Sequence, residues 1–334
     1  MSRYTVMSKN KRKNVVVIGG GTGTFTVLTG LKKYPVNLTA IVTMSDDGGS
    51  TGTLRDELGV LPPGDVRQSL VALSASDHLM RTLMNYRFEH GSLKGHSFGN
   101  LLLSALEKIT GGFDTAVEKT SDILRTRGRV VPATLDKVTL MAKVGRRTIR
   151  GEQNIQKTKL NGALKKLWLK PRGRANPKAL AALQRADAIV FAPGNLYASI
   201  VPDLLVQGIP QAVRKSHARK ILVCNLMTKA EHTKNFTVAD YTAIIEQYLG
   251  GPVDYVIYNN TMPDKKLLKR YAREGDAPTS WNVLPENRNT VGAALASRRM
   301  PMLDSSDALR HERLFRHDPA RLGRLLMHLM RTRR

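Results

Sequence analysis

The chain has 334 residues, of which 41% are hydrophobic and 24% are charged. This composition is typical of a globular protein with a substantial core, and it excludes wholesale disorder and collagen-like or coiled-coil rods. The single cysteine, Cys224, excludes an internal disulfide and is best interpreted as a small apolar core residue. No apolar run approaches the roughly 20 residues of a spanning helix, so we expect a reduced, cytoplasmic protein with no membrane span.

The formal net charge of +26 is concentrated in three blocks. Residues 1–13 hold 5 Lys and Arg and no acid, residues 137–174 hold 12 against 1, and residues 297–334 hold 10 against 4. Blocks of this kind can neutralise nucleic-acid phosphates. However, aromatic residues make up only 5% of the chain, and we identify no stacking pattern interleaved with the charge. A solvated basic surface is therefore favoured, and nucleic-acid binding is kept as a less favoured alternative.

The first predicted strand, residues 14–18, is followed by a glycine turn and a helix at 25–31. The turn consists of Gly19, Gly20, Gly21, Thr22 and Gly23. Glycines there let the backbone approach a phosphate and point N–H groups at it. The dinucleotide fingerprint asks for a further glycine where this chain has Thr24, and no P-loop ending is present. The position directly after the first strand favours phosphate binding over a plain tight turn.

A second predicted strand, residues 38–44, is followed by a loop that carries Asp46, Asp47 and Ser50. An acid about 20 to 25 residues beyond the glycine turn commonly holds ribose hydroxyls in doubly wound folds. The paired carboxylates are also suited to Mg²⁺ beside phosphates, because that ion takes one or two carboxylates and keeps waters. An Asp-Gly turn is the structural alternative. The two aspartates exceed what a turn needs, so we interpret them as functional.

Two further polar loops each precede a predicted helix. The helices span residues 66–74 and 101–109. Asp65 is a natural N-cap, and Arg67 can form a fork with a phosphate or a carboxylate. His96 and Asn100 lie at the start of the second helix, where a histidine suits acid–base chemistry or a structural hydrogen bond. Helix N-termini that converge on one crevice make an anion site. The catalytic candidates are Asp46, Asp47, Asp65 and His96.

The middle of the chain changes character near residue 128. Short alternating runs broken by charged turns, at residues 138–144, 148–149 and 167–169, predict a small β-rich insertion. Strands then follow at 188–191, 220–224 and 253–258. They alternate with helices at 179–185 and 238–249 and with a helix that follows the loop at 192–195 and ends at 206. This alternation predicts an α/β fold with a mostly parallel sheet covered on both faces. The predicted organisation is a basic leader (1–13), a nucleotide-binding core (14–128), a basic insertion (129–175) and the remaining core with a C-terminal helix (176–334).

The loop after the strand at 188–191 contributes Gly194, Asn195 and Tyr197, which suit the recognition of a base or a sugar. No Gly-x-Ser-x-Gly elbow, His-Glu-x-x-His motif or cysteine pair is present in the sequence. A serine nucleophile and a zinc site therefore find no support.

Seven stretches, in this order, resemble the YvcK/CofD-like family, and specifically its bacterial gluconeogenesis factors. They are GGGTG at 19–23, SDDGGSTG at 45–52, PPGDVR at 62–67, GHSFGNLLL at 95–103, APGNLYASIVPDLL at 192–205, ARKILVCNLMT at 218–228 and LRH at 309–311. They span nearly the whole chain, and their joint occurrence is far more specific than any one of them.

The resemblance implies a Rossmann-like, doubly wound α/β fold with a small inserted subdomain and a nucleotide site at the carboxyl ends of the strands. It implies ligand contacts from Asn225, from Tyr271 in a segment similar to part of the family's UDP-sugar site, and from Arg310 in the LRH motif. The loop at 192–199 departs from the usual Gly-Pro-Gly-Ser-Leu-Tyr-Thr-Ser pattern of bacterial relatives. The departures are Ala192, Asn195 and Ala198.

Bacterial members of the family are regarded as cytoplasmic proteins that bind UDP-sugars, notably UDP-N-acetylglucosamine. They are linked to cell shape, envelope synthesis and growth on gluconeogenic carbon, and have no established reaction. A distant branch contains the 2-phospho-L-lactate transferases, which use Mg²⁺ and a nucleotide-activated phospho-acid. The leading hypothesis is therefore a regulatory UDP-sugar-binding protein. The alternative is a Mg²⁺-dependent transferase with Asp46, Asp47 and Asp65 as candidates for metal ligand or base, the metal being assigned to Asp46 and Asp47. No cofactor other than Mg²⁺ is implied, and a homo-oligomer is left open.

Overall fold

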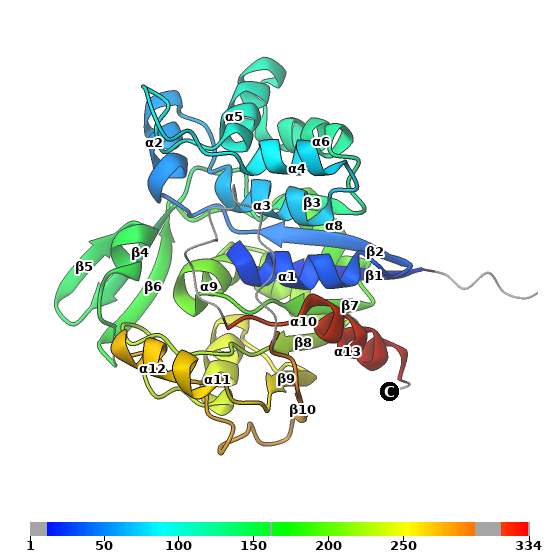
Figure 1. Ribbon diagram of the computed structural model, residues 1–334, viewed down its shortest axis with the longest axis vertical. Helices are drawn as coiled ribbons and strands as arrows, with labels where there is room; N and C mark the ends of the chain where they lie inside the picture. The colour runs from blue at the N-terminus through cyan, green and yellow to red at the C-terminus, as the bar shows by residue number, and fades with distance from the viewer. Residues whose placement is uncertain (1–11, 161, 298–314, 333–334) are drawn as a thin grey trace, which may run out of the picture.

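The computed structural model describes residues 12–160, 162–297 and 315–332 (Figure 1). Most of the basic leader, and Arg310 with the rest of the LRH motif, lie outside the described residues. Within these ranges, no helix combines the length and the apolar character that crossing a membrane requires.

A seven-stranded parallel sheet forms the centre of the described chain, in the order β10-β9-β8-β7-β1-β2-β3 (Figure 1). Its strands are β1 (Lys13–Ile18), β2 (Val36–Val42), β3 (Arg129–Pro132), β7 (Ala188–Phe191), β8 (Arg219–Val223), β9 (Tyr255–Asn259) and β10 (Asn289–Ala293). From β1 the chain builds outward through β2 and β3, and then in the opposite direction from β7 to β10. This is the doubly wound order of a Rossmann-like sheet, so the predicted fold class is confirmed.

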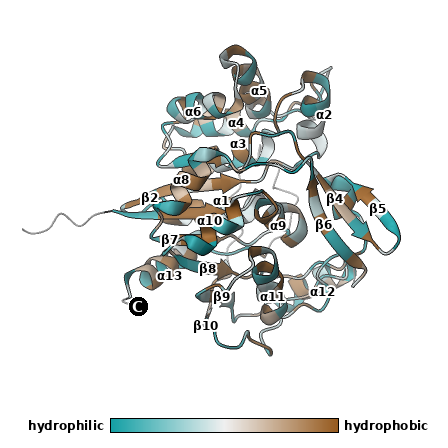
Figure 2. Cartoon of the chain, turned by 180° about the vertical axis from the view of Figure 1, so that it is seen from behind, coloured by the Kyte–Doolittle hydropathy of each residue, from teal (hydrophilic) through white to brown (hydrophobic). Residues whose placement is uncertain are grey.

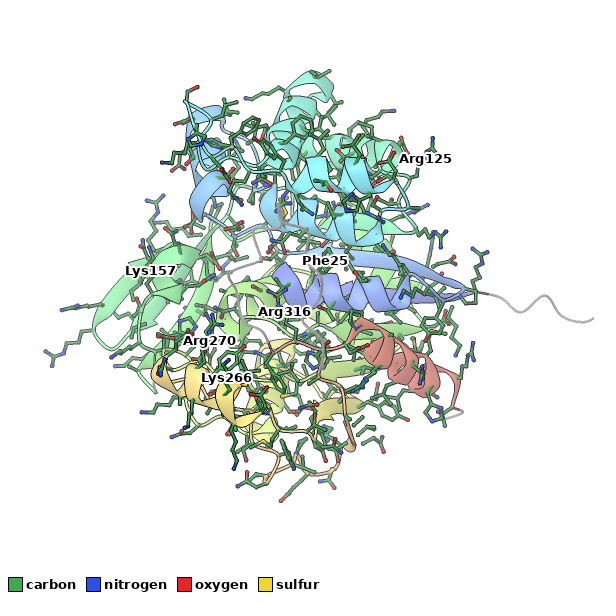
Figure 3. The ribbon with its side chains drawn as sticks, viewed as in Figure 1. Phe25, Arg125, Lys157, Lys266, Arg270 and Arg316 are labelled. Atoms are coloured by element: carbon green, nitrogen blue, oxygen red, sulfur yellow. The ribbon has the colours of Figure 1, made fainter. Side chains whose placement is uncertain are left out.

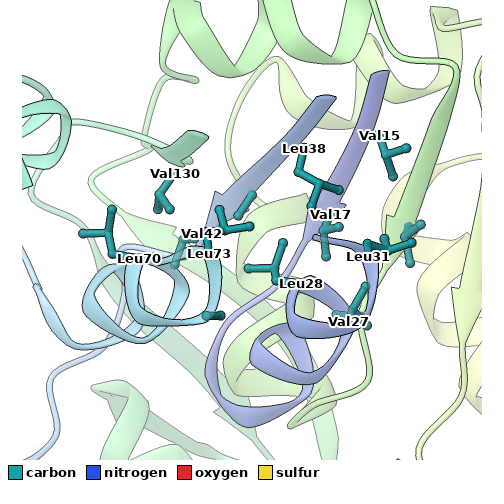
Figure 4. Close-up of a cluster of buried hydrophobic side chains, with 14 of the residues drawn as sticks. Val15, Val17, Val27, Leu28, Leu31, Leu38, Val42, Leu70, Leu73 and Val130 are labelled. Atoms are coloured by element: carbon teal, nitrogen blue, oxygen red, sulfur yellow. The ribbon is translucent and has the colours of Figure 1, made fainter. Parts of the chain in front are cut away.

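The burial of β1 explains why the sheet is covered on both faces. Val15 and Val17 point to one hydrophobic cluster, and Val16 and Ile18 point to the other. All four are at most 2% exposed. Figure 4 shows the first cluster, in which Val15 and Val17 lie with Leu28 of the following helix. Each such buried side chain stabilises the fold by about 1.5–3 kcal/mol relative to exposure.

Helices cover both faces, with hydrophobic residues concentrated along the strands between them (Figure 2). On the face of the first cluster, α1 (Gly21–Leu31) packs against α3 (Gly64–Leu73) and α13 (Pro319–Arg331). The chain between β2 and β3 also contains α2 (Gly49–Leu58), α4 (His78–Asn85), α5 (Phe98–Thr110) and α6 (Phe113–Ile123). The opposite face carries α8 (Pro177–Gln184), the π-helix η1 (Leu196–Ile200), α9 (Val201–Leu204), α10 (Ile209–Lys215) and α11 (Val238–Leu249). Helix α12 (Lys265–Arg273) follows β9, and α13 is the predicted C-terminal helix.

A separate three-stranded antiparallel sheet is inserted in the chain between β3 and α8, with the strand order β5-β4-β6. It comprises β4 (Thr139–Val144), β5 (Arg147–Arg150), the short α7 (Glu152–Gln156) and β6 (Leu164–Lys170). A β-rich insertion was therefore predicted correctly, but it begins later than residue 129. Residues 129–132 form β3, which pairs with β2 in the large sheet. The sequence of β3 has only two apolar β-branched residues between Arg129 and Pro132, and a proline argues against a strand within a sheet.

The strand order reverses between β1 and β7, which are hydrogen-bonded neighbours. In doubly wound sheets, the loops after two such strands diverge and leave a crevice at their carboxyl ends. The small sheet lies beyond this same edge of the large sheet (Figure 1). The glycine turn, the loop at 192–195 and the insertion therefore meet in one region.

Candidate functional site

A cleft of about 860 Å³ opens at the carboxyl ends of β1 and β7. The loops after β1, β2, β7 and β8 contribute to its lining, together with α7 of the insertion and α12. Small-molecule sites typically occupy 300–1,000 Å³, so the cleft has the size of a cofactor or metabolite site.

The glycine turn brings the start of α1 against Asp65. Gly20 and Gly21 line the cleft, and the Gly21 N–H donates to Asp65 Oδ1 over 3.0 Å. A Cβ on Gly20 would collide with the Asp65 carboxylate, so only glycine allows this approach. The prediction that Asp65 caps its own helix is wrong, because the N-cap of α3 is Pro63. The Asp65 carboxylate instead satisfies an N–H of α1, the orphan donor of another helix.

The loop after β7 packs against the same helix start. A Cβ on Gly23 would collide with the Pro193 carbonyl, so Gly23 serves close packing between two loops. The Asn225 side chain fixes this loop from β8: its Oδ1 accepts from the Gly194 N–H over 3.1 Å and its Nδ2 donates to the Gly194 carbonyl over 2.7 Å. Gly194 and Asn195 are thereby held at the cleft.

Four carboxyl groups line the cleft, those of Asp46, Asp65, Glu152 and Glu274. The pKa of Asp65 is raised to about 7 and that of Glu152 to about 9. Burial is the larger cause in both, and repulsion from the neighbouring Asp46 is the second. Burial also raises the pKa of Asp46. At neutral pH the Glu152 carboxyl is therefore protonated and can donate a hydrogen bond. We call Asp46, Asp65 and Glu152 the acidic wall.

Asp47 supports the acidic wall and does not itself line the cleft. Its carboxylate accepts hydrogen bonds from the Glu152 and Gln153 N–H groups over 3.1 and 2.8 Å, at the start of α7. A carboxylate at this position satisfies orphan N–H donors of a helix start. Sequence reasoning missed Glu152, although a signal was present: Glu152 is the single acid within the basic residues 137–174.

Arg67, His96, Asn100 and Ser50 form a hydrogen-bonded network that joins α2, α3 and α5. Arg67 is only 5% exposed, and its Nε donates to Asn100 Oδ1 over 3.0 Å. Ser50 Oγ accepts from Asn100 Nδ2 over 3.3 Å and lies 3.0 Å from His96 Nδ1. These four residues, for which the sequence favoured ligand contacts, thus have protein partners and do not line the cleft. A guanidinium is rarely buried without such partners.

Positive charge reaches the cleft from three separate segments. Arg87, Lys229 and Arg270 all contribute to its lining. Figure 3 labels Arg270 on α12, the helix that lies beside the small sheet. Arginine and lysine side chains suit phosphate recognition. No sequence motif joins these three residues, so only the fold brings them together.

Tyr271 lines the cleft and is 3% exposed. Its hydroxyl oxygen accepts a hydrogen bond from the Phe315 N–H over 3.1 Å, which links α12 to the segment that leads into α13. Arg310, the other residue implied by the family resemblance, precedes that segment outside the described residues.

A second cavity, of about 600 Å³, shares His232 with the cleft. Tyr197 lines this second cavity and packs edge-to-face on His232, with ring centroids 6.3 Å apart. His232 Nε2 lies 3.0 Å from the Ile155 carbonyl, so that nitrogen carries the proton and Nδ1 remains an acceptor. Burial lowers the pKa of His232, which favours the neutral ring. Tyr197 thus contacts a residue of the main cleft and does not line that cleft itself.

The acidic wall fits Mg²⁺ in its chemistry. Asp46 and Asp65 present carboxyl oxygens, and burial raises the pKa of both groups, with repulsion from Asp46 adding to the rise at Asp65. A cation between them would offset the cost of holding both as carboxylates. Across the described residues, no group of three or more His, Cys, Asp or Glu side chains is arranged to hold a metal ion. Mg²⁺ commonly completes its coordination with water and substrate phosphates. The fit is therefore to a cation shared with a phosphorylated ligand.

The predicted ligand-binding residues divide into three groups. Those that line the cleft are Gly20, Gly21, Thr22, Asp46, Asp65, Gly194, Asn195, Asn225 and Tyr271. Those that lie outside its lining are Gly19, Gly23, Asp47, Ser50, Arg67, His96, Asn100 and Tyr197. Arg310 lies outside the described residues. Parallel strands end at one edge of the sheet, which explains why motifs far apart in sequence meet there.

Comparison with known proteins identifies relatives over most of the chain. The family model of 2-phospho-L-lactate transferase CofD matches residues 15–299. A "Gluconeogenesis factor" from Halalkalibacterium halodurans is 41% identical over 306 residues, which are 90% of this chain and 93% of that protein. A "Putative gluconeogenesis factor" from Clostridium acetobutylicum is 44% identical over 266 residues, which are 78% of this chain and 59% of that protein.

A solved structure supports the same relationship. The crystal structure of a UPF0052-family protein from Bacillus halodurans aligns with a TM-score of 0.85 at 37% sequence identity. The alignment covers 95% of this chain and 99% of that one. The family match spans most of the sequence, and the relatives share the fold at substantial identity, so the chain belongs to the CofD family and is related to the bacterial gluconeogenesis factors.

Proposed function

We propose that this protein binds a UDP-sugar, of the type of UDP-N-acetylglucosamine, in the cleft and acts as a regulator. One observation carries the proposal: a metabolite-sized cleft lies at the switch point of a Rossmann-like sheet and combines a helix start, three cations and four carboxyl groups. A nucleotide-sugar has complementary chemistry. Its diphosphate needs N–H donors and cations, and its sugar hydroxyls need polar partners.

Each side of the cleft has a role in this proposal. The start of α1 and Arg87, Lys229 and Arg270 meet the diphosphate. Asn195 and the protonated Glu152 carboxyl meet hydroxyl or amide groups, since both can donate hydrogen bonds.

Calorimetry with purified protein and UDP-N-acetylglucosamine tests the proposal. We expect binding, and we expect Arg270→Gln to weaken it about tenfold or more, because a charge-assisted hydrogen bond is lost. Arg273→Gln is the matched control, since Arg273 lies exposed on the same helix and does not line the cleft. No heat of binding with the wild type, or equal weakening by both variants, would contradict the proposal.

The regulatory part of the proposal rests on the relatives, whose names refer to gluconeogenesis. We infer that a cytoplasmic protein reporting the supply of a nucleotide-sugar would connect carbon metabolism to envelope synthesis and cell shape. A strain lacking the protein should then grow poorly on gluconeogenic carbon and regain growth with the wild type. Rescue by a variant that calorimetry shows to be unable to bind the nucleotide-sugar would separate growth from ligand binding.

A second candidate is a Mg²⁺-dependent transfer of the phospholactate type, favoured by the paired carboxyls of Asp46 and Asp65 and by the name of the family. A cation held there would neutralise phosphate charge on a nucleotide-activated substrate. Asp46 and Asp65 would bind it, and Gly21 and Arg270 would orient the phosphates. Product formation from nucleotide-activated phospholactate and a deazaflavin acceptor tests this candidate, and absence of turnover with Mg²⁺ present would overturn it.

A further inference from the structure

The small sheet has one buried and one outward face. Residues 140, 142, 167 and 169 alternate into the core, where all four side chains are buried. The intervening positions therefore point outward, because successive side chains of a strand lie on opposite faces. We call this outward surface the basic sheet face. Its residues are Thr139, Met141, Lys143, Thr148, Arg150, Lys166, Trp168 and Lys170.

Strand pairing arranges these residues in cross-strand rows. Trp168, Met141 and Arg150 form one row across β6, β4 and β5. Lys166, Lys143 and Thr148 form the next row, and Lys170 pairs with Thr139 on the other side. Neighbouring strands lie about 5 Å apart and alternate residues of one strand about 7 Å apart. The Trp168 ring thus lies between Lys166 and Lys170 on β6, with Lys143 diagonally across on β4.

The charge of this surface is uniformly positive. Four of its eight residues are Lys or Arg, and none is acidic. The only acid of residues 137–174 is Glu152, whose side chain lies in the cleft. Lys143 donates to the Arg146 carbonyl, and among the described ion pairs none involves a residue of this face. The cations are therefore available to an anionic partner.

Trp168 supplies the stacking element that the linear sequence did not suggest. Lys166 Nζ lies 5.7 Å from the centroid of the Trp168 ring. The segment Lys166-Leu167-Trp168-Leu169-Lys170 interleaves cations and one aromatic residue on the outer face, with leucines on the inner face. The period of two places these residues on one face of β6 and the leucines on the other.

We propose that the basic sheet face binds single-stranded RNA. A small sheet with a surface aromatic ring flanked by cations is suited to stacking an unpaired base and neutralising adjacent phosphates. Thr139 and Thr148 add hydroxyl groups to the same face, which can pair with ribose 2′-hydroxyls. A duplex hides its base faces and cannot use the tryptophan. The residues of this face do not line the cleft, so the site is separate from the proposed nucleotide-sugar site.

Fluorescence anisotropy with a labelled 12-nucleotide oligouridylate measures the proposed binding. The variant Lys143→Gln/Lys166→Gln/Lys170→Gln should lower affinity at least tenfold and reduce the slope of log K against log salt by about 2, at about 0.7 per phosphate contact. The matched control is Lys108→Gln/Lys119→Gln/Lys215→Gln, which removes the same charge from exposed positions of α5, α6 and α10. Equal loss in both variants would overturn the assignment to this face.

Tryptophan fluorescence tests the stacking contact independently. The chain has only two tryptophans, so a quench on RNA binding can be assigned by substitution. Trp168→Leu keeps apolar cover on the sheet and should abolish the quench and weaken binding about tenfold, whereas Trp168→Phe should restore most of the affinity. Unchanged affinity in folded Trp168→Leu, checked by circular dichroism, would overturn the stacking role.

Three further probes decide the kind of ligand. Saturating UDP-N-acetylglucosamine should leave RNA binding unchanged, and displacement would place the RNA in the cleft instead. The matching DNA oligonucleotide and an RNA duplex should bind more weakly, and equal affinity for either would overturn the single-stranded RNA assignment. Vesicles with 30% phosphatidylserine should not compete with the oligonucleotide, and binding to vesicles alone would identify a membrane surface as the partner.

Discussion

At the residue scale, the cleft is governed by buried carboxyl groups whose protonation depends on their neighbours. Asp65 is in contact with the start of α1, and Glu152 reaches the same cavity from the insertion. Burial penalises the charged form of each group, and a second carboxylate adds to that penalty. These buried carboxyl groups destabilise the ligand-free protein. A bound cation or hydrogen-bond acceptor would reduce that destabilisation, as expected of a binding site.

The raised pKa of Asp65 makes stability depend on pH. The folded state holds the proton up to about pH 7, whereas an unfolded aspartic acid loses it near 3.9. Stability from this group is therefore complete below about pH 4 and is lost as the pH rises towards 7. Asp65→Asn keeps an acceptor for the Gly21 N–H. At pH 8 its free energy of unfolding, measured with urea, should exceed that of the wild type by on the order of 3 kcal/mol, and at pH 4 the two should be nearly equal. An advantage of the same size at both pH values would contradict this origin.

Gly23 is expected to be required for packing. A Cβ there would meet the Pro193 carbonyl, so Gly23→Ala should destabilise the protein by about 1–3 kcal/mol in urea unfolding, although alanine favours helices. Gly112→Ala is the control, because nothing lies within 4 Å of its added Cβ and its φ is −164°. Equal stabilities of the two variants would show that the loop after β7 moves to accommodate the added Cβ without a loss in free energy of unfolding.

At the element scale, the helix α7 has only 5 residues but connects the insertion to the core and to the cleft. Its start is bonded to Asp47 of the core, and it carries Glu152 into the cleft. The insertion is further attached through Arg55, which donates to the Val138 carbonyl over 3.2 Å. The loop after β2 and the insertion thus form one wall of the site, although about a hundred residues separate them in the chain.

Removing the Asp47 cap should loosen this wall locally. Asp47→Ala leaves the Glu152 and Gln153 N–H groups without their acceptor, at a cost of about 0.5–2 kcal/mol. Hydrogen exchange should then accelerate at residues 152–156 and remain unchanged in the large sheet. Asp47→Asn retains an acceptor oxygen and should preserve most of the protection. Faster exchange throughout the molecule would indicate global destabilisation instead.

At the scale of the whole molecule, the cleft lies between the Rossmann-like sheet and the insertion. Contacts on its other side tie the insertion to the chain after β8: the Leu160 N–H donates to the Glu231 carbonyl over 2.6 Å, and His232 lies against the Ile155 carbonyl. A ligand in the cleft would contact core and insertion together. It should therefore stabilise the molecule as a unit.

Thermal unfolding measures this linkage. At a UDP-N-acetylglucosamine concentration 100 times its Kd, the folded state should gain about 2.7 kcal/mol, and Tm should rise accordingly. Arg270→Gln should show a smaller rise at the same concentration, whereas Arg273→Gln should match the wild type. An unchanged Tm in wild type at saturating ligand would contradict binding to the native state.

Much of the architecture follows from local patterns. The runs at 188–191 and 238–249 coincide with β7 and α11, because their apolar spacing and flanking turn residues are local properties. Strand β3 ends in a proline and helix α7 has only 5 residues, so neither has a clear local pattern and neither was predicted. Among site residues, Asp46, Gly194 and Asn195 lie in loops after strands and reach the cleft, whereas Arg67 and His96 bond to side chains of other helices.

The sequence by itself determined the Rossmann-like fold class, the β-rich insertion, the family and the loops that form the cleft, since these depend on periodicity, turn chemistry and motifs. Only the tertiary structure decided that Asp65 caps α1, that Asp47 holds α7, that Glu152 enters the cleft and that cations of two strands lie near Trp168 on an outer face. The physical reason is that a side chain's partner depends on which strand ends and faces meet in space. That meeting is fixed by strand order and register, which local sequence does not specify.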